Sequence, residues 1–145
     1  MGDPSGLHEI GYMYDFGDYG VEKDPYKARE WYEKAADFGV SNSMCRLGNF
    51  YEFGGEYAVP KDIHKAMEWY KKAADLGDNE AMDDIAGLYQ DDAEYNYGVF
   101  TDDYRKALEW YRKLIETSSD TTSYSFKKAQ EQIPKLEEIL RKTNG

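Results

Sequence analysis

Apolar residues recur every three or four positions in three stretches of the chain, with charged residues between them. In the first stretch the apolar positions are Ala28, Trp31, Ala35 and Phe38, at successive spacings of three, four and three residues. This spacing places the four side chains on one face of an α-helix. The sequence therefore predicts three amphipathic helices, each with one apolar face.

The three stretches are copies of one another, because each contains a Trp-Tyr pair in similar surroundings. The pairs lie at 31–32, 69–70 and 110–111, so the copies are offset by 38 and 41 residues. Residues that keep one register in every copy behave as core residues rather than as a ligand cage. We therefore expect the Trp-Tyr pairs to pack in the core.

The ends of these helices are also marked in the sequence. Asp24, Asp62 and Asp103 each stand seven residues before a tryptophan, where a carboxylate can accept hydrogen bonds from the first helical turn. Gly39 and Gly77 follow the first two copies. Glycine tolerates the left-handed conformation that ends many helices, so the first two helices are expected to stop there.

A shorter motif precedes each of these helices and predicts a second helix in every repeat. Its copies begin at Ile10-Gly11, Leu47-Gly48 and Ile85-Ala86. A small residue stands four positions before each copy, and these residues are Gly6, Ser43 and Ala81. Small residues at this spacing allow two helices to approach closely. Each repeat is therefore predicted to contain helix A, a loop and helix B.

The full pattern reads small-x3-Leu-Gly-x2-Tyr, then Gly-Val, then Asp-x2-Lys-Ala-x2-Trp-Tyr-x2-Ala-Ala-x2-Gly. It resembles the Sel1-like repeat, a relative of the tetratricopeptide repeat, over about residues 6–118. The resemblance implies an all-α fold, a right-handed α-solenoid of three helix-turn-helix repeats. The expected divisions are an N-terminal tail at 1–5, repeats at 6–41, 42–79 and 80–118, and a C-terminal capping helix at 119–145.

The last stretch of the chain has its own apolar stripe, which supports the capping role. Residues 119–123 are expected to form a loop and a helix start. The apolar positions that follow are Phe126, Ala129, Ile133, Leu136 and Leu140. A solenoid needs such a terminal element to cover its last repeat. Pro134 is expected to kink this helix or to begin a new one.

The charge of the chain narrows the classes of partner. The net charge is −11, from 29 acidic and 18 basic residues, which disfavours nucleic acid and anionic membranes and favours a basic partner.

The single cysteine, Cys45, fits a reducing compartment. Residues 1–6 lack the features of a signal peptide, and no apolar run approaches a membrane span. We expect a cytoplasmic monomer.

Residues 78–103 are acidic and contain no lysine or arginine. Asp92, Glu94, Asn96 and Asp103 come close to the spacing of a calcium loop, but the glycine falls one position too late. The run is also interpretable as a docking patch for a basic partner. Its third and most common interpretation is a solvated face.

The sequence contains no phosphate-binding glycine loop and no nucleophile elbow. His8 and Cys45 occupy matching positions in adjacent repeats, so a Cys-His pair is conceivable, but no third catalytic group is evident. We therefore expect no enzyme activity, no cofactor and no metal. An enzyme remains a remote alternative.

The resemblance also implies where a partner binds, because in this family the outer side of helix A lines a concave groove. Counting from the Leu-Gly motif, we expect the partner-binding residues to be His8, Tyr12, Asp15, Cys45, Asn49, Glu52, Glu80, Asp83 and Gln90. The implied function is a protein-interaction scaffold or adaptor that binds a protein or peptide there. The alternative is an acidic immunity-type inhibitor that neutralises a basic toxin or effector.

Overall fold

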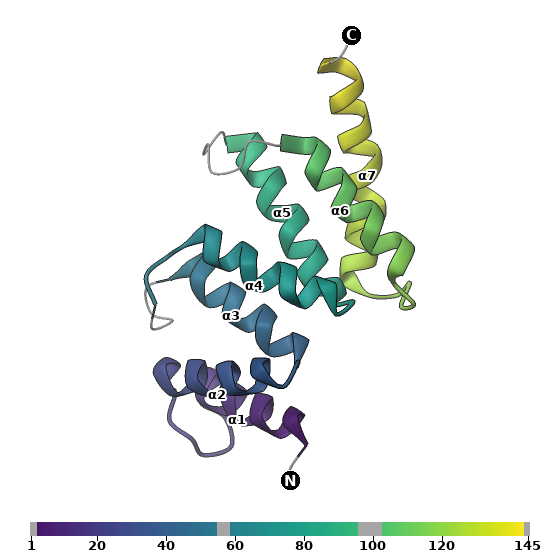
Figure 1. Ribbon diagram of the computed structural model, residues 1–145. Helices are drawn as coiled ribbons and strands as arrows, with labels where there is room; N and C mark the ends of the chain where they lie inside the picture. Colours follow the sequence, from purple (N-terminus) through teal and green to yellow (C-terminus); the bar gives the residue numbers. More distant parts are fainter. Residues whose placement is uncertain (1–2, 55–58, 96–102, 144–145) are drawn as a thin grey trace. The chain divides into compact units, whose positions relative to one another are not determined.

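The computed structural model describes residues 3–54, 59–95 and 103–143, and every regular element in these ranges is an α-helix. The side chains of Tyr95 and Asp103 are outside this description. The helices are α1 (Pro4–Phe16), α2 (Pro25–Asp37), α3 (Ser41–Phe53), α4 (Ile63–Asp75), α5 (Asn79–Tyr95), α6 (Asp103–Thr117) and α7 (Tyr124–Thr143). The expected all-α fold of paired helices is confirmed (Figure 1).

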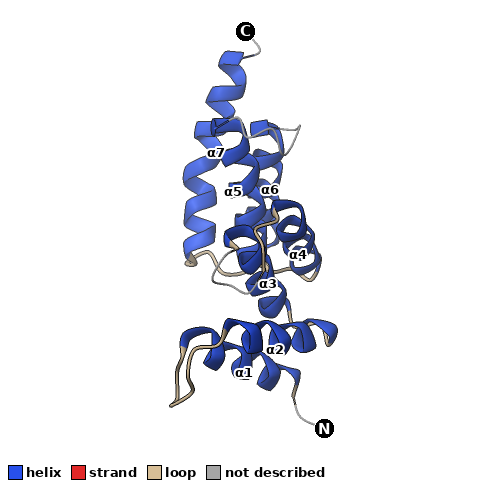
Figure 2. Ribbon diagram, turned by 90° about the vertical axis from the view of Figure 1, so that its left-hand side faces the viewer, coloured by secondary structure: helices blue, strands red, loops and turns tan. Residues whose placement is uncertain are grey.

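The chain folds as two compact units, residues 1–76 and 77–145. Unit 1 contains the hairpins α1–α2 and α3–α4, and α2 also packs on α3. Unit 2 contains the hairpin α5–α6, and α7 packs on both of these helices. In Figure 2 the described residues of both units form helices, with tan loops and turns between some of them. Each unit is therefore built from helix A and helix B pairs, as the sequence predicts.

The helix boundaries follow the polar signals of the sequence. Asp24 accepts hydrogen bonds from the backbone amides of Tyr26 and Lys27, each at 3.1 Å. Asp62 accepts one from the amide of Lys65 at 3.1 Å. These carboxylates satisfy amides that have no partner inside the helix. The first two predicted helix starts are confirmed, and the side chain that would cap the third is outside the described residues.

The predicted helix ends at Gly39 and Gly77 are also confirmed. Their φ angles are 82° and 85°, in the left-handed region that residues with a side chain rarely adopt. Helices α2 and α4 end two residues before these glycines. After Gly39 the chain enters α3, helix A of the second repeat, which packs on α2.

The tyrosine of each Trp-Tyr pair forms the centre of the core. Tyr32, Tyr70 and Tyr111 are 0% exposed. On α2 the buried face runs through Ala28, Tyr32 and Ala35, and Phe38 is 67% exposed. The prediction that Phe38 belongs to the core face was wrong, because the helix turns the bulky tyrosine inwards.

The tryptophans lie at the edge of the core instead. They are half-buried. The ammonium group of the lysine three residues later lies over the ring of each tryptophan. The three Nζ-to-centroid distances are 4.5 Å for Lys34–Trp31, 4.6 Å for Lys72–Trp69 and 4.7 Å for Lys113–Trp110. Residues three apart lie on neighbouring positions of a helix surface, which makes this cation–π contact possible.

The buried tyrosines explain why helix A carries a glycine. A Cβ on Gly11 would lie 2.7 Å from Cδ1 of Tyr32, and a Cβ on Gly48 would overlap the ring of Tyr70. Atoms cannot approach so closely, so the backbone of helix A must lack a side chain at these positions. The predicted close approach of helices A and B therefore takes the form of a tyrosine ring on a glycine.

Helix α7 fulfils the predicted capping role for unit 2. Ser123 begins it by accepting a hydrogen bond from the amide of Phe126 at 3.2 Å. The residues of its stripe that are buried are Phe126, Ala129 and Leu136, and the half-buried ones are Ile133 and Leu140. Pro134 lies inside this one helix. No new helix begins there, and Pro134 itself is exposed.

Candidate functional site

The hydroxyl group of each core tyrosine reaches helix A four residues after the glycine position. These three residues of helix A, Asp15, Glu52 and Gln90, are among the predicted partner-binding residues. The contacts are Tyr32 Oη to Asp15 Oδ2 at 3.0 Å, Tyr70 Oη to Glu52 Oε2 at 2.5 Å and Tyr111 Oη to Gln90 Oε1 at 3.4 Å. The side of helix A that the sequence predicts to bind a partner is therefore hydrogen-bonded to the core tyrosine in every repeat.

Asp15 is the most deeply placed of these residues, at 3% exposure. Arg46 of α3 donates to its Oδ2 from Nε at 3.2 Å and from Nη2 at 2.5 Å. Burial, followed by the Asp15 charge, raises the pKa of the Tyr32 hydroxyl, which therefore stays protonated and donates. Asp15 thus joins three helices of unit 1 through one carboxylate.

His8 and Cys45 are both at least partly buried. His8 is half-buried, its Nδ1 is 2.8 Å from the hydroxyl of Ser43, and its ring is 5.3 Å from that of Tyr32. Burial lowers the pKa of His8 below its usual value. Cys45 is 2% exposed. His8 is thus hydrogen-bonded to a serine of the neighbouring helix A.

Tyr12 and Asn49 occupy matching positions of α1 and α3. Tyr12 is 38% exposed, and its ring stacks against that of Phe16 with centroids 4.5 Å apart. Asn49 is half-buried and accepts a hydrogen bond from Tyr70 Oη at 2.6 Å. Unit 1 therefore presents an aromatic surface at this position in its first repeat and an amide in its second.

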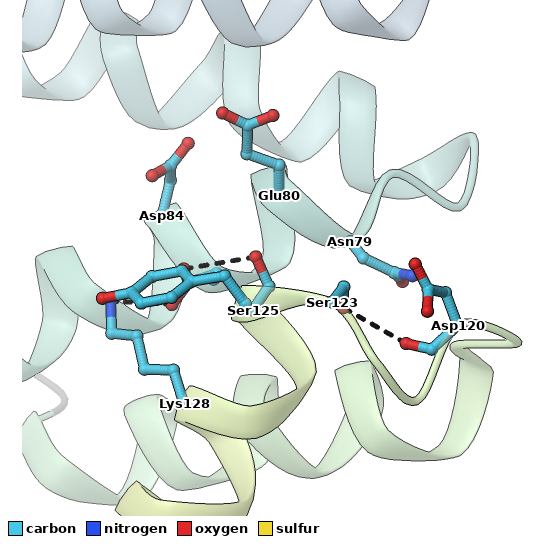
Figure 3. Close-up of a pocket in the computed structure, with 9 residues that line it drawn as sticks. Asn79, Glu80, Asp84, Asp120, Ser123, Ser125 and Lys128 are labelled. Carbon is cyan, nitrogen blue, oxygen red and sulfur yellow. Dashed lines mark hydrogen bonds and ion pairs between the residues drawn. The ribbon is translucent and has the colours of Figure 1, made fainter.

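In unit 2 a pocket of about 580 Å³ lies between the start of α5 and the start of α7. It contains two of the predicted partner-binding residues, Glu80 and Asp83. Figure 3 shows Glu80 and Asp84 projecting from the same side of α5. The pocket is lined by Asn79, Glu80, Asp83, Asp84, Asp120, Ser123, Tyr124, Ser125 and Lys128. Four carboxylates and one ammonium line it, so its charge is negative.

The charged groups of this pocket are held in place by α7. Lys128 Nζ lies 2.8 Å from Asp83 Oδ1, and the hydroxyl of Ser125 lies 3.5 Å from Oδ2 of the same carboxylate (Figure 3). Burial is the largest single effect and lowers the pKa of Lys128, but the hydrogen bond to Asp83 and the negative charges around Lys128 together outweigh it, so the pKa is raised. Asp83 therefore binds α7 to α5 through Lys128 and Ser125. Of the two predicted partner-binding acids of α5, Glu80 is the exposed one.

Sequence reasoning missed Arg46 and Lys128, which play matching roles. Arg46 follows Ser43 by three residues, and Lys128 follows Ser125 by three. In both cases the serine and the cation contact helix A of the preceding repeat. The recurrence of Ser-x2-Arg/Lys was the signal in the sequence. It shows that α7 takes the place on repeat 3 that α3 takes on repeat 1.

The calcium interpretation of the acidic run finds no support in the described part of the chain. Asp92 and Glu94 lie within helix α5 rather than in a loop, and Asn96 is outside the described residues. Within the described ranges, no group of three or more histidine, cysteine, aspartate or glutamate residues is arranged to hold a metal ion.

The repeat pattern matches a known family over most of the chain. The model of the Sel1 repeat matches residues 4–39, 41–78 and 80–116. The chain belongs to the Sel1 repeat family. Sel1-repeat proteins are generally protein–protein interaction scaffolds and are typically non-catalytic. The recognition of the repeat from sequence is therefore confirmed.

Two solved Sel1-repeat structures resemble the fold. A Sel1 repeat protein from Oxalobacter formigenes has 35% identity and a TM-score of 0.71, and the match covers 90% of this chain and 47% of that one. A protective antigen of uropathogenic Escherichia coli with an SLR fold has 30% identity and a TM-score of 0.71, over 91% of this chain and 25% of that one. This Sel1-repeat chain thus spans about half or a quarter of their lengths.

A search of curated proteins finds no match. Among the described residues, no helix is both long enough and apolar enough to span a membrane.

Proposed function

We propose that this Sel1-repeat chain is an interaction scaffold that binds a partner protein or peptide through the outer side of its A helices. The observation that carries the proposal is a contrast within helix A. The position that faces the core tyrosine is glycine or alanine in every repeat, whereas the outer positions differ from repeat to repeat. A repeated scaffold that presents different side chains at equivalent positions can recognise one specific partner.

The partner that fits unit 2 is basic. The α5–α7 pocket has four carboxylates against one ammonium, and that ammonium is already paired with Asp83. The chain as a whole carries a net charge of −11, which accelerates encounter with a cation. We propose Glu80 as the central acid, with Gln90 as a contact further along α5.

In unit 1 the contact residues of the proposal are His8, Tyr12, Asn49 and Glu52, which keep at least part of their surface in solvent. Asp15 and Cys45 are almost fully buried. Their proposed part is to hold the contact surface in shape from below. A pre-ordered surface lowers the entropy cost of binding.

The proposal is tested by affinity capture from the source cells at low and high salt, followed by measurement of the affinity of the captured partner. The decisive bait carries Glu80→Lys and Asp84→Lys. The control bait carries Glu109→Lys and Glu116→Lys, which make the same charge change at exposed positions of α6 outside the pocket.

We expect the partner to be basic, to be released by salt, and to bind the pocket variant at least about tenfold more weakly than the control variant. A single tight partner would favour an inhibitor, and several partners would favour an adaptor. Equal capture by both variants would show that the pocket does not take part in recognition.

A further inference from the structure

The outer surface of unit 1 contains an ordered aromatic cluster, formed by Tyr12, Phe16 and Arg46. The rings of Tyr12 and Phe16 lie 4.5 Å apart, and the guanidinium of Arg46 lies 5.1 Å from the centroid of Phe16. Tyr12 is 38% exposed and Phe16 is 50% exposed. Aromatic rings and arginine are the side chains most enriched in protein interfaces.

This cluster is held in place rather than mobile on the surface. The guanidinium of Arg46 is fixed by two hydrogen bonds to the buried carboxylate of Asp15, and Asp15 also accepts from Tyr32. The ring of Phe16 is thus covered on one side by a cation that cannot move freely. The other side of the pair is open to solvent, which is costly for large apolar rings unless a partner covers them.

The helix A position that Phe16 occupies is aromatic only in the repeats of unit 1. Phe16 stands five residues after Gly11, and Phe53 stands five residues after Gly48 and is 63% exposed. In repeat 3 the equivalent residue is Asp91, which is exposed. Unit 1 therefore presents phenylalanine where unit 2 presents a carboxylate.

The charges around the cluster define what can cover it. Arg46 is the only lysine or arginine on α1 and α3, and its charge is neutralised by Asp15. Glu9 lies three residues before Tyr12 and is exposed, and Asp18 follows the helix and is exposed. The chain segment that carries the two rings therefore also carries exposed carboxylates, one before and one after them in the sequence.

We infer that the Tyr12–Phe16 surface binds a basic peptide segment of the partner that carries one large apolar side chain beside its lysine or arginine residues. The apolar side chain covers the two rings, and the basic side chains pair with the exposed carboxylates of this segment. The inference rests on the proposed interaction role and specifies what the unit 1 surface around Tyr12 requires of the partner, namely an apolar anchor.

The test selects short random peptides displayed on phage against the full chain and then measures the affinity of the enriched peptides by fluorescence anisotropy. The decisive variants are Phe16→Ala and Tyr12→Ala. The control is Tyr26→Ala, which removes an exposed ring from α2 of the same unit, at 64% exposure. Circular dichroism checks that each variant stays folded.

We expect the enriched peptides to combine lysine or arginine with a large apolar residue. Phe16→Ala should weaken them about tenfold or more, and Tyr26→Ala should leave them unchanged. Failure to enrich such peptides, or equal binding by Phe16→Ala, would overturn the inference. So would dimerisation in sedimentation velocity that Phe16→Ala abolishes, because a second copy would then be the occupant.

The two proposals fail separately. If the Glu80 and Asp84 reversal abolishes partner binding while Phe16→Ala does not, the interaction role stands and the aromatic anchor is wrong. If neither variant changes partner binding, the proposed role of both surfaces fails.

Discussion

The aromatic ring of Tyr70 lies directly against the backbone of Gly48, in the space that a side chain at Gly48 would occupy. The ring cannot move aside easily, because its hydroxyl oxygen is held within hydrogen-bonding distance of both Asn49 Oδ1, at 2.6 Å, and Glu52 Oε2, at 2.5 Å. The contact joins α3 to α4 and recurs between Gly11 and Tyr32. In repeat 3 Ala86 replaces the glycine, and the tyrosine hydroxyl there has the longest contact of the three, at 3.4 Å.

Gly48→Ala should therefore lower the free energy of unfolding by about 2 kcal/mol, because the new methyl group overpacks the interface with Tyr70. Chemical denaturation followed by circular dichroism measures the change. Gly87→Ala is the matched control, since nothing lies within 4 Å of the Cβ it would add. The control should be stabilised by about 0.5–1 kcal/mol through helix propensity. Stabilisation of both variants alike would contradict the packing argument.

Arg46→Met should lower the free energy of unfolding by about 3 kcal/mol, because it leaves the buried carboxylate of Asp15 without its cation. Denaturant titrations of Arg46→Met, Asp15→Asn and the double variant measure the coupling between the two residues. The double variant should recover part of the loss, since no uncompensated charge remains. Strictly additive single effects would show that the ion pair makes no specific contribution.

The repeat pattern predicted the fold well because it reports on the core. Every copy needs a small residue, glycine or alanine, under the same tyrosine, and such a requirement is visible when the repeats of one sequence are compared. The helix caps at Asp24 and Asp62 were predictable for a similar reason, since each acts on amides in its own first turn. The buried and exposed sides of α2 were less predictable, because Trp31 and Tyr32 are both large and only packing decides which one turns inwards.

The candidate site was only partly predictable, because its residues depend on contacts between distant segments. Glu80 and Asp83 were expected on the outer side of helix A, and both line the pocket of unit 2. Lys128 comes to that pocket from α7, more than forty residues away along the chain. The burial of Asp15 likewise depends on Arg46 of the next repeat, which no pattern within α1 indicates.

His8 should make the stability of unit 1 depend on pH. Burial, the largest effect, lowers its pKa below 6.5, and Arg46 acts in the same direction, while Glu9 and Asp15 oppose it. The unfolded chain then binds more protons than the folded chain between the lowered pKa and 6.5, so stability falls as the pH drops through that window. His8→Asn should flatten the dependence measured by denaturation between pH 7 and pH 5.

The control for His8 is His64→Asn, since His64 is exposed on α4. This variant should keep the pH dependence of the original chain. If His64→Asn rather than His8→Asn flattened the curve, the burial of His8 would not be the cause.

Pro134 lies inside α7, where its ring removes one backbone donor and crowds the preceding turn. The helix nevertheless continues to Thr143, because Leu136 beyond the proline is fully buried and holds the second half in place. Pro134→Ala should therefore raise the free energy of unfolding of unit 2, by up to about 3 kcal/mol, without changing the packed stripe. Thermal unfolding followed by circular dichroism measures the gain, and Lys135→Ala, also exposed on α7, is the control. A loss of stability on replacing the proline would mean that α7 requires a bend at this position to keep Leu136 in the core.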